Sequence, residues 1–257
     1  MLVLLSCAKT MSAVSKVKVP LTTSPRFQKE AAEIALQMSQ FSVDELERLL
    51  RVNAKIAVEN YKRYQAFHAE ATPELPALLA YTGIVFKRLN PKDFSAEDFG
   101  YAQEHLRLTS FCYGLLRPLD VIRAYRLEGD VVLPELGNQT LFFYWRSRLT
   151  DTFIEDIRSA GGILCNLASD EMKSLFDWKR VEKEVRVVTP EFHVWKNGKL
   201  ATIVVYTKMS RGEMTRFILK NKIGNPEELK GFSWEGFEFD ESLSDERKLV
   251  FINGMGE

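Results

Sequence analysis

Three arginines lie close together in the segment 111–128, which also contains a glycine and an Arg-Pro pair. A guanidinium group binds phosphate or carboxylate oxygens well, because its N–H donors are held in a fixed fork. Gly114 tolerates the left-handed backbone with which many helices end, and Pro118 suits the first turn of a following helix. The segment therefore predicts a helix, a short hairpin and a second helix. The arginines are Arg117, Arg123 and Arg126.

In this arrangement Tyr113, Gly114 and Leu115 would form the hydrophobic-Gly-hydrophobic centre of a helix-hairpin-helix element. Free backbone N–H groups at such a helix start can bind a DNA phosphate. The alternative interpretation is structural, because many helix pairs are joined through glycine and arginines often bind nearby carboxylates such as Asp120 and Glu128. A short motif does not decide between the two.

A second group of cations lies in the segment 206–216, where a strand over 200–206 is expected to end and a helix over 210–222 to begin. Loops and helix starts of this kind often bind anions through backbone N–H groups. Gly212 fits either a close backbone approach or a tight first turn. The cations of this group are Lys208, Arg211 and Arg216.

Lys9 follows a short apolar strand over 2–5, and the small residues Ser6, Cys7 and Ala8 before it leave room for a ligand. The alternative is a solvated lysine in a loop, the common case for a lone lysine. The segment 166–171 places polar residues after another predicted strand.

No sequence pattern indicates a metal or a cofactor. The glycine-rich nucleotide loops and the Gly-x-Ser-x-Gly elbow are absent, and the histidines have no metal-ligand spacing. We therefore expect neither group. The histidines are His68, His105 and His193.

The predicted elements indicate an α+β fold, with a mixed, largely antiparallel sheet flanked by helices and containing the helix-hairpin-helix element. Ser42 and Glu45 form a capping box, and Asn197-Gly198 is the strongest hairpin signal. Helices are expected over 25–40, 43–52, 53–67, 95–112, 142–160 and 210–222; strands over 2–5, 163–168, 185–188, 192–195, 200–206 and 248–252; and a strand or turn over 80–87.

The composition is that of a globular protein without a strong charge. The 257 residues include 35 basic and 35 acidic side chains and are 46% hydrophobic. We expect one domain over residues 1–257, and any nucleic-acid site must come from local clustering of cations. Three widely spaced cysteines favour a reducing cytoplasm. No segment indicates a membrane as a partner, and no protein partner can be inferred.

Seven motifs together resemble the YaaA family of bacterial peroxide-stress proteins over nearly the whole chain. They are Leu4–Thr10, His105–Leu108, Tyr113–Asp120, Tyr125–Glu128, Asn166–Glu171, Ser210–Gly212 with Arg216–Ile218, and Gly231-Phe232 with Gly236-Phe237.

The resemblance implies a cytosolic protein that acts in hydrogen peroxide stress, limits free intracellular iron, and binds DNA through a basic cleft and a helix-hairpin-helix in an unusual mixed α/β fold. The positions that would bind DNA are Lys9, Tyr113, Gly114, Leu115, Arg117, Arg123, Arg126, Lys208, Arg211 and Arg216.

The chain departs from the family pattern at three places. Cys7 replaces a proline, Met209-Ser210 precedes Arg211 where a lysine and an alanine are usual, and the end at 251–257 lacks the usual basic residues. Fewer cations weaken phosphate binding. Cys7 adds a thiol beside Lys9, for which inert packing is the simpler interpretation and peroxide sensitivity the alternative.

Two classes of function follow, and whether the protein is an enzyme stays open. The first is a DNA-binding protein that contacts phosphates with little base reading. The second is an enzyme acting on damaged DNA or on a small anionic substrate, with an amine nucleophile and a carboxylate as its acid-base partner. The amine would be Lys9 or Lys208, and the carboxylate Asp120, Glu128 or Asp170.

Overall fold

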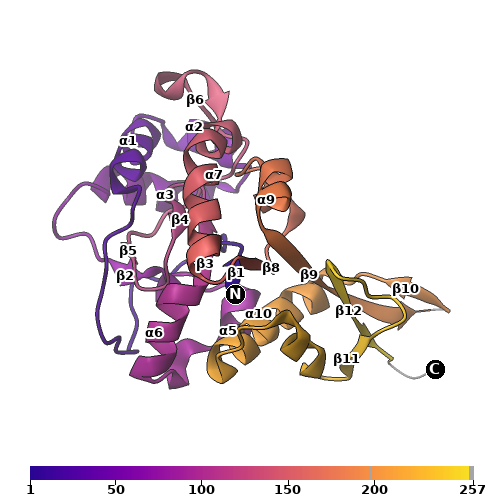
Figure 1. The fold of residues 1–257 in the computed structure, drawn as a ribbon. Helices are drawn as coiled ribbons and strands as arrows, with labels where there is room; N and C mark the ends of the chain where they lie inside the picture. Colours follow the sequence, from indigo (N-terminus) through magenta and orange to yellow (C-terminus); the bar gives the residue numbers. More distant parts are fainter. Residues whose placement is uncertain (197, 255–257) are drawn as a thin grey trace.

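A computed structural model describes residues 1–196 and 198–254, and a mixed sheet lies at its centre (Figure 1). The strand order is β11-β12-β9-β8-β1-β3-β4, with β10 paired to β9. The strands of this sheet are β1 (Leu2–Leu5), β3 (Leu106–Ser110), β4 (Gly114–Leu116), β8 (Ile163–Asn166), β9 (Arg186–Lys196), β10 (Lys199–Ala201), β11 (Phe237–Asp240) and β12 (Lys248–Asn253).

Helices cover the sheet on both sides, with α7 and α9 on one side in Figure 1 and α5, α6 and α10 on the other. The helices are α1 (Gln28–Met38), α2 (Val43–Leu50), α3 (Ala54–Ala66), α4 (Ala77–Ala80), α5 (Ile84–Leu89), α6 (Ala96–His105), α7 (Leu141–Ser159), α8 (Asp170–Lys173), α9 (Trp178–Glu184) and α10 (Val204–Asn221). The short elements are η1 (Pro91–Asp93), η2 (Pro134–Leu136), η3 (Pro226–Gly231), and the strand pairs β2 (Leu75–Pro76) with β5 (Val121–Ile122) and β6 (Val132–Leu133) with β7 (Gln139–Thr140).

The α+β class with a mixed sheet is confirmed, but the prediction of a largely antiparallel sheet is wrong. Five neighbouring strands, β12, β9, β8, β1 and β3, run parallel, and within the described residues antiparallel pairing involves β4, β10 and β11. Helices between successive strands supply the crossovers that parallel pairing requires. The alternation of strands and helices after residue 141 was the sequence signal for parallel pairing.

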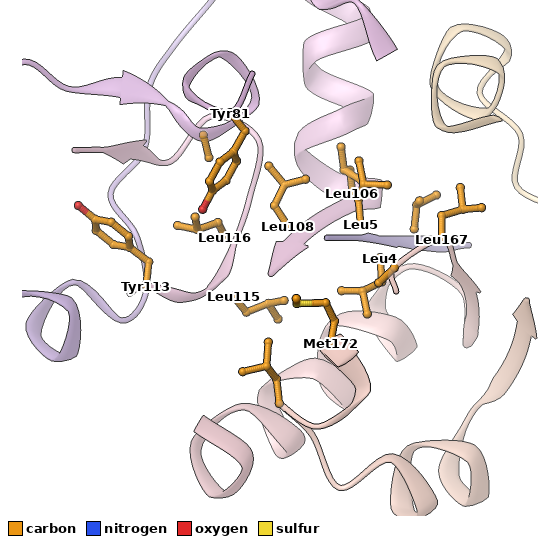
Figure 2. Packing of buried hydrophobic residues seen from close by; sticks show 14 of the residues in the cluster. Leu4, Leu5, Tyr81, Leu106, Leu108, Tyr113, Leu115, Leu116, Leu167 and Met172 are labelled. Atoms are coloured by element: carbon orange, nitrogen blue, oxygen red, sulfur yellow. The ribbon is translucent and has the colours of Figure 1, made fainter. Parts of the chain in front are cut away.

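Strand β1 lies inside the parallel group, between β8 and β3. All four of its residues are buried, as expected for a strand covered on both faces. Leu4 lies opposite Arg107 of β3 and opposite Asn166 of β8. Figure 2 shows Leu4 and Leu5 packing among Leu106, Leu108, Leu115, Leu167 and Met172.

The predicted helix-hairpin-helix is wrong. Helix α6 ends at His105, and the next residues form β3, which pairs antiparallel with β4. No helix begins at Pro118. Apolar spacing up to residue 111 fits a helix, but β3 is fully buried beside β1, and this tertiary pairing overrides the local pattern.

Gly114 is needed for a different reason from the one predicted. Its φ of 70° lies in the left-handed region, where it begins β4. A Cβ at this position would lie 2.7 Å from the ring of Trp145 in α7. Gly114 therefore allows a tight turn against a buried tryptophan.

The start of α10 also differs from the prediction. β10 ends at Ala201 and α10 begins at Val204, so Lys208 and Arg211 lie within one helix, one turn apart. The predicted capping box of Ser42 with Glu45 is confirmed. Strand β9 pairs with β10 through Lys196 opposite Lys199, as the hairpin signal predicts, although Asn197 lies outside the described residues.

Candidate functional site

A cavity of about 320 Å³ lies at the carboxyl ends of the central parallel strands. Its walls come from residues 5–10 after β1, 167–172 after β8 and Phe111 after β3, together with α5, α10 and residues 125–127. The chain places β3 on one side of β1 and β8, the later strand, on its other side, so the direction in which strands are added reverses at β1. Ligands in parallel α/β sheets bind at such a reversal, because the loops diverge there and leave a crevice.

Four cations line this cavity, and all four are among the ten predicted site residues. Lys9 and Lys208 are exposed, whereas Arg126 and Arg211 are partly buried. They come from the loop after β1, the segment before β6 and helix α10. The cavity therefore gathers positive charge in a chain whose net charge is zero.

Two of these cations have a buried N–H group without a partner. The Nε atoms of Arg126 and Arg211 make no hydrogen bond with any residue that the structure describes. Burial also lowers the pKa of the Arg211 guanidinium, and Asp170 opposes this change only in part. A buried donor without an acceptor is costly, so these two groups suit an anionic ligand that supplies the acceptors.

Glu128 holds the other side of the cationic group together. Its carboxylate accepts hydrogen bonds from Lys9 Nζ at 2.8 and 3.0 Å, and from Arg126 Nη2 at 3.3 Å. The Glu128 side chain is only 12% exposed. One carboxylate thus serves two cations, which leaves a positive excess at this wall.

The loops after β1 and β8 are tied to each other by serine hydroxyls. The Ser169 backbone N–H donates to Ser6 Oγ at 2.9 Å, and the two hydroxyl oxygens lie 3.2 Å apart. Both serines line the cavity. The contact fixes the two strand-end loops and places neutral polar groups beside the cations.

The surroundings of Cys7 disfavour its reactive thiolate form. Burial raises the pKa of its thiol to about 12, and Glu171 and Glu128 act in the same direction. A thiol reacts with peroxide as its thiolate, which such surroundings suppress. The structure thus supports the packing interpretation of Cys7 and gives no support to activation by Lys9.

The inner wall of the cavity is apolar and rigid. Phe111, Tyr125, Leu127 and Met172 line it and are buried. The Tyr125 hydroxyl is hydrogen-bonded to Tyr81 at 2.8 Å and to Ser110 at 2.7 Å, and burial raises the pKa of both tyrosines well above its usual value. These hydroxyls remain neutral and hold the Tyr125 ring in place.

Two glycines bring the surrounding helices close. A Cβ on Gly212 would lie 2.3 Å from the carbonyl oxygen of Val85, so this glycine sits where α10 meets α5. A Cβ on Gly83 would lie 2.9 Å from Ala8 Cβ, which brings the start of α5 onto the loop after β1. Gly212 is therefore needed for the packing of α10 on α5, and neither for a first turn nor for contact with a ligand.

The structure does not bring the remaining predicted residues to the cavity. Arg117 binds the buried Asp120 at 2.9 Å, Arg123 binds Glu74 at 3.0 Å, and Arg216 binds Asp93. Tyr113, Gly114 and Leu115 are buried in the core. The structural interpretation of the 111–128 segment thus holds for Arg117 with Asp120 and for Arg126 with Glu128, although Arg126 also lines the cavity.

Several cavity residues were not predicted. The segment 80–87 was expected as a strand or turn, but it contains Gly83 and the start of α5, where Ile84 lines the cavity. The glycine followed by an apolar run was a signal for a close approach. Nothing in the local sequence marked Phe111 or Met172 as cavity residues, because their positions depend on the sheet order.

The fold and the cavity define a class: an α+β protein with a cationic cavity where parallel strands end. The chain matches the family described as "Peroxide stress protein YaaA" over residues 1–243. It is 98% identical over 257 residues to a UPF0246 protein of Bacteroides thetaiotaomicron and 79% identical over 257 residues to one of Bacteroides fragilis, each pair covering 100% of both chains. It is 38% identical over 253 residues to a UPF0246 protein of Crocosphaera subtropica, covering 98% of this chain and 100% of the relative. The chain belongs to the YaaA family of peroxide stress proteins.

No helix among the described residues has the length and apolarity that a membrane crossing needs.

Proposed function

We propose that this protein binds DNA during peroxide stress and contacts phosphate groups through the cationic cavity. The observation that carries the proposal is the set of four cations that line the cavity, two of which, Arg126 and Arg211, also have a buried Nε–H group without an acceptor in the described structure. Phosphate oxygens are strong acceptors that match a guanidinium. Lys9 and Lys208, exposed at the same cavity, would attract the DNA backbone.

The distribution of charge supports a local contact and not a broad basic surface. The 35 basic and 35 acidic residues cancel, and Arg117, Arg123 and Arg216 each have a carboxylate partner. Binding should therefore depend on a small number of phosphates. In the same proposal the protein limits free intracellular iron, as the resemblance implies. Equal levels of chelatable iron in peroxide-treated cells with and without the protein would overturn this role in iron limitation.

The test compares two arginines of the same helix, Arg211→Gln and Arg216→Gln, by fluorescence anisotropy with labelled DNA across a salt series. For each phosphate neutralised, log affinity should fall by about 0.9 per log unit of salt. Arg211→Gln should lose about tenfold in affinity and show a shallower slope. Arg216→Gln should bind as the wild type does, because Arg216 is paired with Asp93. Equal binding by the wild type and Arg211→Gln would remove the cavity from the proposal.

The second candidate function is an enzyme acting on damaged DNA or on a small anionic substrate. The observation that favours it is the position of Lys9 Nζ, 2.8 Å from the Glu128 carboxylate at the edge of the cavity. A lysine amine can condense with an aldehyde to an imine, with loss of water, and a carboxylate can move the protons.

Borohydride trapping on DNA that contains an abasic site separates this candidate from simple binding, because borohydride reduces an imine to a stable amine adduct. The candidate predicts a covalent adduct that disappears in Lys9→Gln and persists in Lys18→Gln, a lysine that does not line the cavity. Absence of both an adduct and strand cleavage would exclude the lyase version.

A further inference from the structure

We propose that the cavity holds a single nucleotide that has left the base stack, with its phosphate on Arg126 and Arg211 and its base against the apolar inner wall. This proposal rests on the proposed function, since DNA is the expected source of the nucleotide. The argument depends on how deep the unpartnered donors lie, on the chemistry of the two ends of the cavity and on its volume.

The depth of the arginine groups limits what can reach them. The Nε atoms of Arg126 and Arg211 are buried, and the Arg126 side chain is 16% exposed. The phosphates of an intact duplex lie on the outer surface of a wide, stiff helix, so they can contact Lys9 and Lys208 and reach the two partly buried arginines from the mouth of the cavity, but the duplex cannot enter it. A thin segment of chain or a small molecule can go further, and place a whole nucleotide between the two guanidinium groups and the inner wall.

The two ends of the cavity differ in chemistry. The inner wall carries aromatic and aliphatic side chains such as Phe111, Tyr125 and Met172, which are buried, whereas Lys9 and Lys208 are exposed at the outer end. A ligand that fits both needs a flat, largely apolar body joined to an anionic group. Nucleobases have this character, and they stack on aromatic side chains in many proteins that bind single strands.

The volume agrees with one nucleotide. The cavity measures about 320 Å³, at the lower end of the roughly 300 to 1,000 Å³ typical of small-ligand sites. Ser6 and Ser169 offer hydroxyl groups beside the cations, suited to the polar edge of a base or to a sugar. The shared chemistry is a nucleoside phosphate, and its source is an extrahelical nucleotide of DNA or a free mononucleotide.

The first arm of the test varies only the ligand. Binding is measured by fluorescence anisotropy for a perfect duplex, the same duplex with one bulged adenine, and the same duplex with one bulged abasic residue, all at one salt concentration. A bulged base costs little to unstack, so it should be captured readily. We expect the bulged adenine to bind about tenfold more tightly than either the perfect duplex or the abasic bulge.

The second arm fills the cavity without removing a charge. Ile84 is half-buried at the start of α5 and lines the cavity, so Ile84→Trp places a large ring there. Thr10→Trp, at an exposed lining position, is a second variant that should not disturb folding. Val14→Trp is the matched control, because Val14 is 79% exposed and does not line the cavity. The preference for the bulged adenine should disappear in the first two variants and persist in the control.

The outcomes separate this proposal from the proposed function. If the wild type binds all three duplexes equally and salt-dependently, the protein binds DNA but the nucleotide proposal is overturned. Lack of binding to any duplex, with deoxyadenosine monophosphate binding measured by calorimetry and lost in Ile84→Trp, would keep the nucleotide site and overturn the DNA source. Lack of binding to every ligand would overturn both proposals.

Discussion

Two groups of arginines in this molecule have the same chemistry and different partners. In the hairpin region after β4, Arg117 lies against the Asp120 carboxylate, which is 1% exposed. At the cavity, Arg126 and Arg211 each keep a buried Nε–H group without a hydrogen bond within the described structure. The difference shows that a cluster of cations in the sequence indicates a binding site only where the fold provides fewer acids than cations.

The same comparison extends along helix α10. Arg211 and Arg216 are five residues apart, so they point to different sides of the helix. Arg216 binds Asp93 of η1 and lies over the Phe94 ring, whereas Arg211 lines the cavity. One helix therefore carries one arginine that stabilises the fold and one that is available to a ligand.

The largest expected loss of stability follows from a substitution in the hairpin of β3 and β4. Gly114→Ala places a methyl group 2.7 Å from the buried Trp145 ring at a φ of 70°, so both strain and overpacking follow. The free energy of unfolding should fall by about 3 kcal/mol. Chemical denaturation measures this loss. Gly100→Ala, inside α6 where a Cβ would meet nothing within 4 Å, is the control and should raise stability by up to about 1 kcal/mol. A stable Gly114→Ala variant would contradict the structural role given to this turn.

Removing the paired arginine should be the next largest effect. Arg117→Ala leaves the buried Asp120 without its ion pair, although Asp120 still accepts from Thr23 and from the backbone N–H of residue 117. The free energy of unfolding should fall by about 2 kcal/mol. Arg216→Ala should cost less, because its partner Asp93 is 54% exposed.

The two groups of arginines should also differ in their effect on DNA affinity. Folded Arg117→Ala should bind DNA as the wild type does, in the same anisotropy assay as Arg211→Gln. A loss of affinity in folded Arg117→Ala, equal to that in Arg211→Gln, would break the distinction between the two groups of arginines.

The sequence predicted the local features of helices and strands better than their partners in the fold. The apolar run of β1 and the capping box at Ser42 depend on neighbouring residues, and both were found. The course of 106–116 was mispredicted because its helical spacing competes with pairing to β1, a strand about a hundred residues earlier. Local pattern carries no information on that contact.

The candidate site was predicted in part for the same reason. Lys9, Arg126, Lys208 and Arg211 were all named from sequence, although Lys208 and Arg211 were placed at a strand end and lie within a helix. Which arginines keep an N–H group without an acceptor could not be predicted, because carboxylates such as Asp93 and Glu74 are remote in sequence from the arginines that they bind. Ion pairing across a fold is a property of the tertiary structure.

A pH experiment tests a third ion pair, between Lys220 and the carboxylate of Asp98. Burial acts to raise the pKa of Asp98, but hydrogen bonds from Lys220 Nζ at 2.8 Å and from Ser95 outweigh it and hold the pKa at about 2. The unfolded value is about 3.9. Because the folded pKa is the lower one, this stabilisation is full above pH 4 and is lost as the pH falls toward 2.

Comparing Asp98→Asn with the wild type isolates this contribution. At pH 7 the variant should be less stable by about 1 to 2 kcal/mol, and the difference should shrink between pH 4 and pH 2. Urea denaturation at each pH measures it. Asp93→Asn is the exposed control and should show a smaller difference. A gap between wild type and Asp98→Asn that is constant with pH would show that the ion pair with Lys220 is not its cause.

The smallest expected change in stability is the one that best tests the role of the cavity. Arg211→Gln removes a partly buried charge whose Nε has no acceptor, so little native interaction is lost and a desolvation cost is relieved. The free energy of unfolding should change by less than about 0.5 kcal/mol, or rise, while DNA affinity falls. Thermal denaturation of the free protein, set beside the anisotropy assay, measures both quantities on one sample. A large loss of stability in Arg211→Gln would mean that this arginine stabilises the fold as Arg117 does, and the contrast between the two regions would then disappear.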